Sequence, residues 1–354
     1  MPSIGHPPAA TRRPEVGSPS CFVIAEIGSN HNRDLAEAHR LIGVAAAAGC
    51  NAAKFQTYSA DTLYSRRAPR LSEMDTFVGD DGRITPYELI STLELPRAWH
   101  GELAAHCREA GIEFMSTPFD VAAVEELDPL VARHKLASYD LTNRELVRAC
   151  AATGRPLILS TGHAFLGEVE ESLAWVREVD EAIPVLLLHC TSRYPTPFPE
   201  VNLRVMATLA AAFDCAVGLS DHTLGLEVPV AAAALGAAAL EKHITGDRTH
   251  PGPDHAFALE PGELTAMVAA MRNVEAALGS PRKQPTPGEL ENRLLARRSI
   301  HLVEALPAGT AVEPGHLAML RPGTGIRPAD VDLVLGRRLR RHIEAGEPLT
   351  WEAL

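Results

Sequence analysis

Residues 21–57 read CFVIAEIGSNHNRDLAEAHRLIGVAAAAGCNAAKFQT and contain one strand–helix–strand repeat. The apolar run 21–28 predicts a strand, and apolar residues at helical spacing predict a helix over 34–48. Gly49 stands where a helix C-cap is expected, and 52–57 predicts the next strand. Consecutive strands joined by a helix pair in parallel through a right-handed crossover. The repeat therefore indicates an α/β fold.

The same alternation continues to residue 278. Further strand-like runs lie at 113–118, 134–138, 156–161, 184–191, 215–221 and 239–245. Helix-like segments lie between or after them at 96–110, 121–131, 143–153, 167–178, 201–213, 226–235 and 261–278. With the first two strands, the repeat predicts a closed (β/α)8 TIM barrel over 21–278. An open doubly wound sheet is the structural alternative.

The chain changes character after this alternation. Residues 279–290 begin GSPRKQPTPG, and prolines flanked by glycines are typical of an interdomain linker. From 291 to 354, short apolar pieces separated by Pro and Gly turns predict a small β-rich domain. Residues 1–20 are rich in Pro, Ser and Gly without an apolar run, so we expect a disordered N-terminal extension.

Composition excludes several classes of protein. The chain has 354 residues and a net charge of -12, which argues against nucleic-acid binding because phosphate backbones need a basic surface. No apolar stretch is long enough to span a membrane. The six cysteines are scattered and none forms a CxxC pair, which indicates reduced thiols in a cytoplasmic protein.

Polar or ionisable side chains lie at or near the ends of all eight predicted strands. In a barrel enzyme, functional residues gather at the C-terminal ends of the strands. One such residue is usually just a solvated strand end, but eight together indicate a site. They include Glu26, Lys54, Gln56, Thr117, Lys135, Ser138, Asp140, Ser160, Ser192, Ser220, His222, Glu241 and His243.

Two lysines, Lys54 and Lys135, alternate with apolar neighbours and are predicted to point into the barrel mouth. Buried ammonium groups need anionic company. Nearby hydroxyls make a cradle for phosphate and carboxylate, so a small dianion is the expected ligand. The alternative is a structural ion pair with Glu26 or Asp140, which are otherwise candidates for general acid–base catalysis or for binding substrate hydroxyls.

His222 and His243 come from adjacent strands at the same end of the predicted barrel. Two neutral imidazoles with other positions left to water or substrate suit a divalent metal ion. No fixed-spacing motif supports the pair, and a hydrogen-bonded core histidine is the alternative. Tyr194, in RYPTP, is expected to line the pocket or simply to pack.

The motifs taken together resemble those of the sialic acid synthase family. In order they are IAEIGSNHN, KFQT, STPFD, KLASYDLTN, LILSTG, LHCTSRYPTP, GLSDHT, EKHIT and PGPDH. The later stretch RRSIHLVEALPAGTAVEPGHL resembles that family's antifreeze-like (SAF) domain. The resemblance covers roughly residues 21–350.

The resemblance implies a transferase that condenses phosphoenolpyruvate with an aldose, N-acetylmannosamine or a modified amino sugar, and releases phosphate. It implies Mn2+ as the metal, with Mg2+ or Co2+ as alternatives, and a domain-swapped homodimer. The implied phosphoenolpyruvate ligands are Lys54, Thr117, Lys135, Ser138, Ser160 and Ser220. Glu26, His222, Lys54 and Lys135 are the implied catalytic residues, and His222 and His243 the metal ligands. The implied sugar-side residues are Gln56, Asp140, Tyr194, Asp254 and, from the neighbouring subunit, Arg298.

Several residues depart from the family pattern, mostly on the sugar side. Arg33 replaces a glycine, His163 a methionine, and Ser192 an asparagine, while Tyr139 stands where neuraminate synthases usually carry glycine. We therefore expect the donor chemistry to be retained and the acceptor to be altered, with Tyr139, His163 and Ser192 as specificity candidates.

Two other functions fit parts of the pattern. A Schiff-base aldolase on the same barrel would use Lys54 or Lys135 covalently. A barrel without catalysis would bind a sugar or a partner protein instead, although the intact lysines and histidines argue against it.

Overall fold

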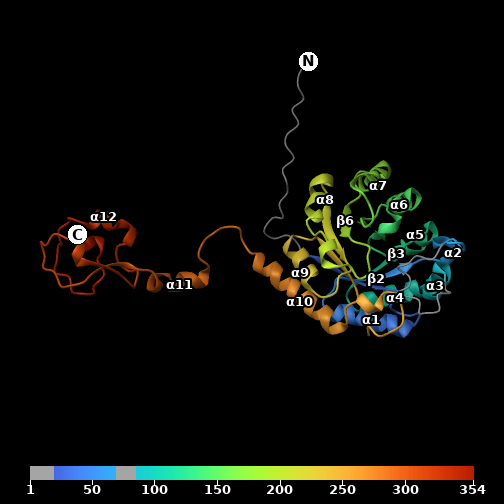
Figure 1. The fold of residues 1–354 in the computed structure, drawn as a ribbon, viewed down its shortest axis with the longest axis horizontal. Helices are drawn as coiled ribbons and strands as arrows, with labels where there is room; N and C mark the ends of the chain where they lie inside the picture. The colour runs from blue at the N-terminus through green and yellow to red at the C-terminus, as the bar shows by residue number, and fades with distance from the viewer. Residues whose placement is uncertain (1–19, 69–84) are drawn as a thin grey trace, which may run out of the picture. The chain divides into compact units, whose positions relative to one another are not determined.

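The computed structural model describes residues 20–68 and 85–354 and divides into two compact units, 1–279 and 280–354 (Figure 1). The predicted extension over 1–20 lies outside the described residues except for Ser20. Among the described residues, no helix has the length and apolar character needed to cross a membrane.

The first unit is built on eight parallel strands. The hydrogen-bonded order is β3-β2-β1-β8-β7-β6-β5-β4, and β3 and β4 lie next to each other. Pairing of the first strand with the last excludes the doubly wound alternative and confirms a (β/α)8 barrel, nearly closed. The strands are β1 Phe22–Gly28, β2 Ala52–Thr57, β3 Glu113–Pro118, β4 His134–Leu136, β5 Leu157–Ser160, β6 Val185–Cys190, β7 Ala216–Asp221 and β8 Ala239–His243.

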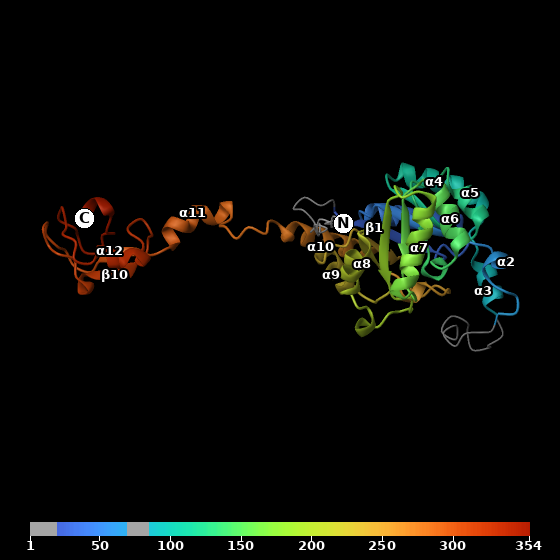
Figure 2. The ribbon, with the colours of Figure 1, turned by 90° about the horizontal axis from the view of Figure 1, so that it is seen from above.

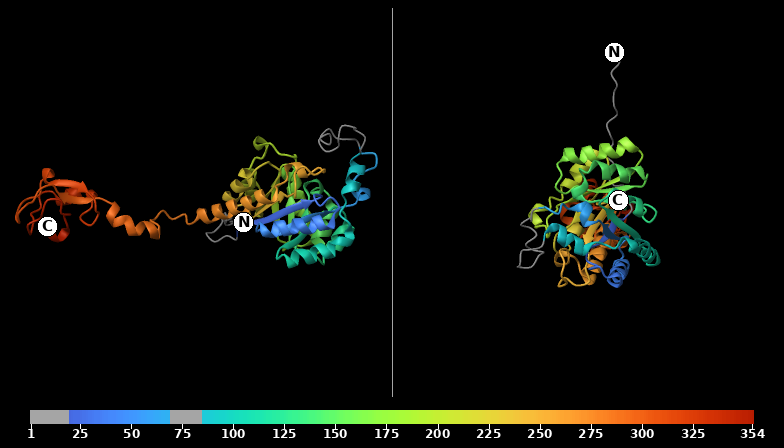
Figure 3. Two further views of the ribbon diagram at one scale, coloured as in Figure 1. Left: turned by 90° about the horizontal axis from the view of Figure 1, so that it is seen from below. Right: turned by 90° about the vertical axis from the view of Figure 1, so that its right-hand side faces the viewer.

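Helices surround these strands (Figures 1 and 3). They are α1 Leu35–Ala47, α4 His100–Glu109, α5 Val121–Leu127, α6 Arg144–Ala152, α7 Leu166–Val179, α8 Val205–Phe213, α9 Glu227–Ala234 and α10 Pro261–Leu278. The main apolar core fills the layer between strands and helices. The Asp34 side chain caps α1 by accepting hydrogen bonds from the amides of Ala36 and Glu37, so the helix begins one residue later than predicted.

Two short helices were not predicted. After β2 the chain forms α2 Ala60–Leu63 and α3 Pro86–Leu93, which lie side by side (Figure 2). Because α2 starts three residues after β2 ends, both belong to the end of the barrel where the strands finish. The predicted helix over 96–110 is divided into a 3-10 turn, Arg97–Trp99, and α4.

Alternation along the strands separates two layers inside the barrel. The lower layer is apolar and contains Ile24, Ala52, Met115, Ile158, Leu188 and Ala239. Two residues further along their strands come Glu26, Lys54, Thr117, Ser160, Cys190 and Glu241. The period of two places all of these on the same inner face, so the apolar layer lies beneath a polar layer that lines the cavity floor.

The second unit has its own apolar core, which includes Ile300, Leu302, Ile326 and Ile343. It contains α11 Pro287–Ala296, an antiparallel pair of β9 Ser299–Leu302 with β10 Leu317–Leu320, and α12 Val331–Val334. Helix α11 starts inside the predicted linker, at a capping box between Thr286 and Glu289.

We expect Gly218→Ala to destabilise the barrel by about 1–3 kcal/mol, the usual cost of overpacking. A Cβ at Gly218 would overlap the carbonyl oxygen of Ala239 and approach Leu188 Cδ2 to 2.8 Å. Gly43→Ala, in α1 where nothing lies within 4 Å of the new Cβ, is the matched control and should be neutral or stabilising. Urea unfolding measures both, and equal stability of the two variants would contradict this packing.

Candidate active site

A cavity of about 520 Å³ opens at the C-terminal ends of the barrel strands. It is lined by most of the residues that the sequence singled out: Glu26, Lys54, Gln56, Thr117, Lys135, Ser138, Tyr139, Asp140, Ser160, Tyr194, Ser220, His222, His243 and Asp254. His163, Ser192 and Arg298 do not line it. The structure therefore brings together side chains from all eight strands or the loops after them.

Lys54 lies at the floor of this cavity. Its Nζ is 2.7 Å from Glu26 Oε2 and donates to Thr117 Oγ1 at 3.1 Å. Glu241 Oε2 is 3.6 Å away. Burial would lower the pKa of Lys54, but Glu241 and Glu26 outweigh it and raise that pKa, so this lysine carries its charge.

Lys135 contacts the carboxylate of Glu241, which Lys54 also contacts. Its Nζ is 3.4 Å from Glu241 Oε2 and donates to the Leu136 carbonyl at 3.3 Å. Burial lowers the pKa of Lys135, against the opposing effect of Glu241. One carboxylate is thus shared by two lysines, each 2% exposed, which leaves positive charge available to an anionic ligand.

The pKa values of Glu26 and Glu241 are shifted in opposite directions. Burial raises the pKa of Glu26 to about 7, although Lys54 opposes it and Glu241 adds to it. Burial would also raise the pKa of Glu241, but Lys135 and Lys54 lower it to about 2. Neighbouring titratable groups whose pKa values are driven apart mark a proton-handling group beside a permanent charge. Glu26 is the former and Glu241 the latter.

The four predicted hydroxyl residues around the lysines differ in their hydrogen bonds. Thr117 accepts from Lys54, and Ser220 donates to Glu241 Oε1 at 3.0 Å. Ser138 Oγ accepts from the Gly162 amide at 2.9 Å. Ser160 Oγ is buried without a partner among the described residues. A buried polar atom of this kind is costly unless a ligand satisfies it, which supports the predicted anion cradle.

His222 and His243 meet at the end of β8, with ring centroids 5.4 Å apart. His222 Nδ1 contacts the Thr191 carbonyl at 3.0 Å, which leaves Nε2 for a ligand. His243 Nδ1 is buried without a hydrogen-bond partner and lies 3.7 Å from Asp254 Oδ2. Burial and His222 lower the pKa of His243, so it is a neutral donor.

This donor set fits a divalent metal held by two imidazoles. An anchored ring with its second nitrogen free is the usual arrangement for a histidine ligand. In the part of the chain that the structure describes, no group of three or more His, Cys, Asp or Glu side chains is arranged to hold a metal. The remaining positions would belong to substrate or water, as in open catalytic sites.

The sugar-side candidates of the barrel all line the cavity. Gln56 Nε2 donates to Glu26 Oε1 at 2.6 Å, and Tyr194 packs on His222 with centroids 4.4 Å apart. Burial raises the pKa of Asp254 to about 6. Burial also raises the pKa of Asp140, whose Oδ2 is buried with no hydrogen-bond partner in the described structure.

The three specificity candidates lie in different places. Tyr139 is 62% exposed at the rim and packs against His163, with ring centroids 5.0 Å apart. His163 has a positive φ of 60° and is exposed outside the cavity. Ser192 is buried behind Gly162, where a Cβ would overlap Ser192 Oγ. Ser192 does not reach the cavity itself, and its Oγ lies 3.8 Å from the Sγ of Cys190, which lines it.

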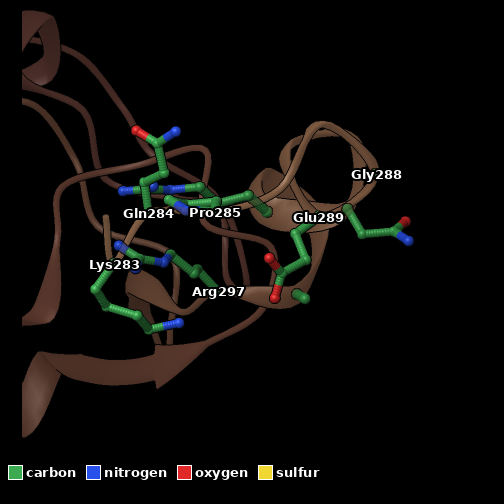
Figure 4. Close-up of a pocket in the computed structure, with 9 residues that line it drawn as sticks. Lys283, Gln284, Pro285, Gly288, Glu289 and Arg297 are labelled. Atoms are coloured by element: carbon green, nitrogen blue, oxygen red, sulfur yellow. The ribbon is translucent and has the colours of Figure 1, made fainter. Parts of the chain in front are cut away.

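Arg298 belongs to the second unit, where it is exposed and donates to the Met319 carbonyl at 3.2 Å. That unit also has a hollow of about 540 Å³ along 283–297, where Figure 4 shows Lys283, Glu289 and Arg297. The hollow has none of the buried catalytic groups found in the barrel.

The sequence placed Glu241 among the polar strand ends but gave it no role in the site. It stands two positions before His243, so strand alternation was the signal that it shares the inner face. Cys190 also lines the cavity, 3.9 Å from His222 Nδ1. An apolar group was missed as well, because it comes from the unpredicted α2 and α3: Leu63, Tyr64, Pro86, Leu89, Ile90 and Leu93.

Comparison with known proteins agrees with this geometry. The model of the NeuB family matches residues 41–283, and that of the SAF domain matches 297–354. The chain belongs to the NeuB family. This confirms the predicted relationship to sialic acid synthases and the predicted SAF domain.

Relatives of this NeuB-family chain differ in the acid they form. It is 41% identical over 344 residues to the N,N'-diacetyllegionaminic acid synthase of Legionella pneumophila, covering 96% of each chain. It is 35% identical over 341 residues to the mouse N-acetylneuraminate-9-phosphate synthase, covering 96% of this chain and 94% of the relative.

A solved structure of the family is also similar. It is the N-acetylneuraminic acid (sialic acid) synthetase of Leptospira borgpetersenii, with a TM-score of 0.68 and 33% identity, covering 77% of this chain and 90% of that one. The NeuB-family chain is accordingly an enzyme of the synthase type.

Replacing a pocket lysine should cost little stability, unlike replacing a structural one. Lys135→Met should stay within about 1 kcal/mol of wild type, because Glu241 keeps Lys54 and Ser220 as partners. Lys242→Met should lose about 3–5 kcal/mol, because Lys242 pairs with buried Asp221 at 2.5 Å on the other face of β8. Urea unfolding of both variants is the measurement, and a larger loss for Lys135→Met would contradict the assignment.

The pH dependence of the unfolding free energy should reveal the raised pKa of Glu26. Its folded pKa of about 7 exceeds its ordinary value of 4.5, so the folded state binds more protons between these values. Its contribution is present below pH 4.5 and is lost as pH rises through 7. The unfolding free energy of wild type minus that of Glu26→Gln should fall by about 3 kcal/mol from pH 4.5 to 8. Parallel pH profiles would show that Glu26 has an ordinary pKa.

Proposed function

We propose that this chain condenses phosphoenolpyruvate with the aldehyde of an amino sugar to form a 2-keto-3-deoxy nonulosonic acid, with release of phosphate. The observation that carries the proposal is the pair of buried lysines around Glu241 beside unpartnered Ser160. This arrangement favours a small polyanion at the barrel floor, and the relatives' names point to nonulosonic acids.

Phosphoenolpyruvate suits the floor because its phosphate and carboxylate need separate partners. Lys54 and Thr117 form one group of donors, and Lys135 lies on the other side of Glu241. Ser138, Ser160 and Ser220 add hydroxyls around the two lysines. When phosphoenolpyruvate is bound between these groups, its C3 carbon would face the sugar side of the cavity.

The proposed reaction forms one carbon–carbon bond and one carbon–oxygen bond, the latter to water, and breaks the carbon–oxygen bond to phosphate. C3 of phosphoenolpyruvate attacks the aldehyde carbon, whose oxygen takes up a proton and becomes a hydroxyl. Water adds at C2 and loses a proton. The resulting tetrahedral carbon expels inorganic phosphate and becomes the ketone.

Glu26 is the proposed proton handler for these steps. Its pKa of about 7 lets it take and return a proton near neutral pH, as general acid–base catalysis requires. Gln56 holds the carboxyl in place from the sugar side, and Lys54 holds it from the floor. Glu241 remains ionised, raises the pKa of Lys54, and opposes the lowering of the Lys135 pKa by burial.

His222 and His243 would hold the divalent metal, for which Mn2+ is proposed, with Mg2+ or Co2+ as alternatives. When bound there, such an ion supplies Lewis-acid polarisation of the aldehyde. The chain's own residues orient the sugar: Asp254 beside His243, Tyr194 over His222, and Asp140 with an unpaired oxygen.

A domain-swapped homodimer is proposed for the assembly, with Arg298 of one subunit reaching the sugar of the other. What supports this is that Arg298 is an exposed cation in a separately folded unit. The protein is also proposed to be cytoplasmic, in keeping with six free cysteines among the described residues.

Phosphate release from phosphoenolpyruvate should require both an aldehyde acceptor and the metal. We expect release with at least one of N-acetylmannosamine, its 6-phosphate and the 2,4-diacetamido-2,4,6-trideoxy hexoses. EDTA should abolish it and Mn2+ restore it, and His243→Ala should lower the rate at least tenfold, since loss of even an outer-shell partner of a metal ligand costs about 10–100-fold. No release from any acceptor, at full metal loading, would refute the synthase function.

The lowered pKa of Lys135 favours one competing chemistry, because a neutral amine could form an imine. Borohydride trapping with pyruvate separates the two functions. We expect no covalent adduct by mass spectrometry, since the proposed reaction needs both lysines charged. An adduct lost in Lys135→Met would establish the aldolase instead.

A further inference from the structure

The two histidines proposed to hold the metal are positioned in different ways. His243 is the last residue of β8, where it pairs with Glu26 of β1. His222 follows directly after β7, whose last residue pair with β8 is Asp221 with Lys242. The sheet therefore fixes His243, whereas His222 lies one residue beyond the last pair that joins β7 to β8.

A set of buried polar groups continues this link past the end of β7. Lys242 Nζ donates to Asp221 Oδ2 at 2.5 Å and, in a close contact, to the carbonyl oxygen of Thr223. The Thr223 amide donates to Asp221 Oδ1 and its hydroxyl to Asp221 Oδ2, both at 3.0 Å. The three residues are at most 3% exposed and do not line the cavity, because strand alternation turns Asp221 and Lys242 to the outer face. We call these three residues the outer bridge.

The other contacts of His222 do not set its distance from β8 in the same way. Its Nδ1 contacts the Thr191 carbonyl at 3.0 Å, and its own carbonyl accepts from the Thr196 amide at 2.9 Å. Both partners belong to the loop after β6, so they orient the ring relative to that strand. Phe257 packs edge-on against both imidazoles, but an apolar contact is not directional.

A divalent metal ion makes strict demands on the spacing of two histidine ligands. Ligand distances in metal sites hold to within about 0.2 Å. The imidazole of His222 must therefore keep a fixed separation from that of His243, although the two come from different strands. The outer bridge meets this demand from behind the site, because it ties Thr223, the residue after His222, to Lys242, the residue before His243.

We propose that the outer bridge sets the spacing of His222 and His243 and so determines how tightly the site binds a divalent metal ion. This inference rests on the proposed function. Lys242 is then a positioning residue, since it reaches neither the cavity nor the metal and acts through the backbone of Thr223. A well-packed apolar pair often stabilises a fold as well as a buried ion pair does, so stability alone does not account for these charges.

Binding of Mn2+ to the full chain tests the proposal, with the EPR signal of the free ion as the readout. Lys242→Met should raise the Kd for Mn2+ about 10–100-fold, the usual cost of losing an outer-shell partner of a metal ligand. Leu103→Ala is the matched control for lost stability, because it truncates a core residue of α4, which packs against β3. It should keep the Kd within about twofold of wild type, since distant sites rarely couple.

Further variants separate positioning from stability. Asp221→Leu combined with Lys242→Met replaces the ion pair by apolar side chains, which often recovers the stability that a lone buried charge costs. We expect the urea midpoint of this double variant to exceed that of Lys242→Met, while its Kd stays at least about tenfold above wild type. Thr223→Val keeps the ion pair and removes one hydrogen bond, so it should raise the Kd about threefold, and Thr223→Ser should restore it.

The outcomes separate this inference from the function on which it rests. Equal affinity of wild type and Lys242→Met for Mn2+ would overturn the inference and leave the proposed function standing. So would a double variant whose Kd recovers together with its stability, since the outer bridge would then act through folding alone. If Lys242→Met does not fold, an unchanged Kd in Thr223→Val overturns the inference in its place. A wild type without affinity for any divalent ion would overturn both the inference and the metal dependence of the proposed function.

Discussion

Two buried lysines that share the carboxylate of Glu241, one of them also 2.7 Å from Glu26, set the conditions for everything else in the active site. Lys54 and Lys135 repel each other and lose hydration, and Glu241 between them compensates only part of that cost. Because the lysines keep Glu241 ionised, Glu26 is the carboxyl that can hold a proton near neutral pH. The same electrostatics therefore favours a dianionic substrate and supplies a proton carrier beside it.

Strand alternation makes this arrangement possible because it separates the inner face of the barrel, which lines the cavity, from the outer face. Glu241 and Lys242 are consecutive in β8, yet alternation sends one to the cavity and the other behind the strand. Lys242 forms a close pair with Asp221 there and serves the fold, whereas Glu241 serves the site. Lys242 thus has a different role from Lys54 and Lys135, and the difference between these lysines is how completely each charge is paired within the protein.

The cavity joins this polar floor to an apolar wall, and the two have different origins. The floor comes from strand ends, whose positions follow from barrel closure. The wall comes from α2 and α3, a segment inserted after β2 and held by contacts such as Tyr87 with Asp61. Insertions after a barrel strand alter one side of a site without moving the others, which is how related barrels keep one chemistry and change substrates. The exposed Tyr139 and His163 lie at another part of the rim, while Ser192 lies behind Gly162.

The sequence by itself determined the alternation of strands and helices, the polar strand ends, and the motifs that identify the family. These are local patterns, so the period of the apolar residues and the spacing of the motifs along the chain are enough to reveal them. Only the tertiary structure decided that Glu241 is shared by both lysines, that Glu26 and Glu241 titrate so differently, and that α3 lines the cavity. Each of these depends on groups distant in the chain, because burial and charge at one atom are set by neighbours that barrel closure brings together. Arg298 is a further case: its motif marks it in the sequence, and the structure places it in the second unit, where it is exposed and donates to the Met319 carbonyl.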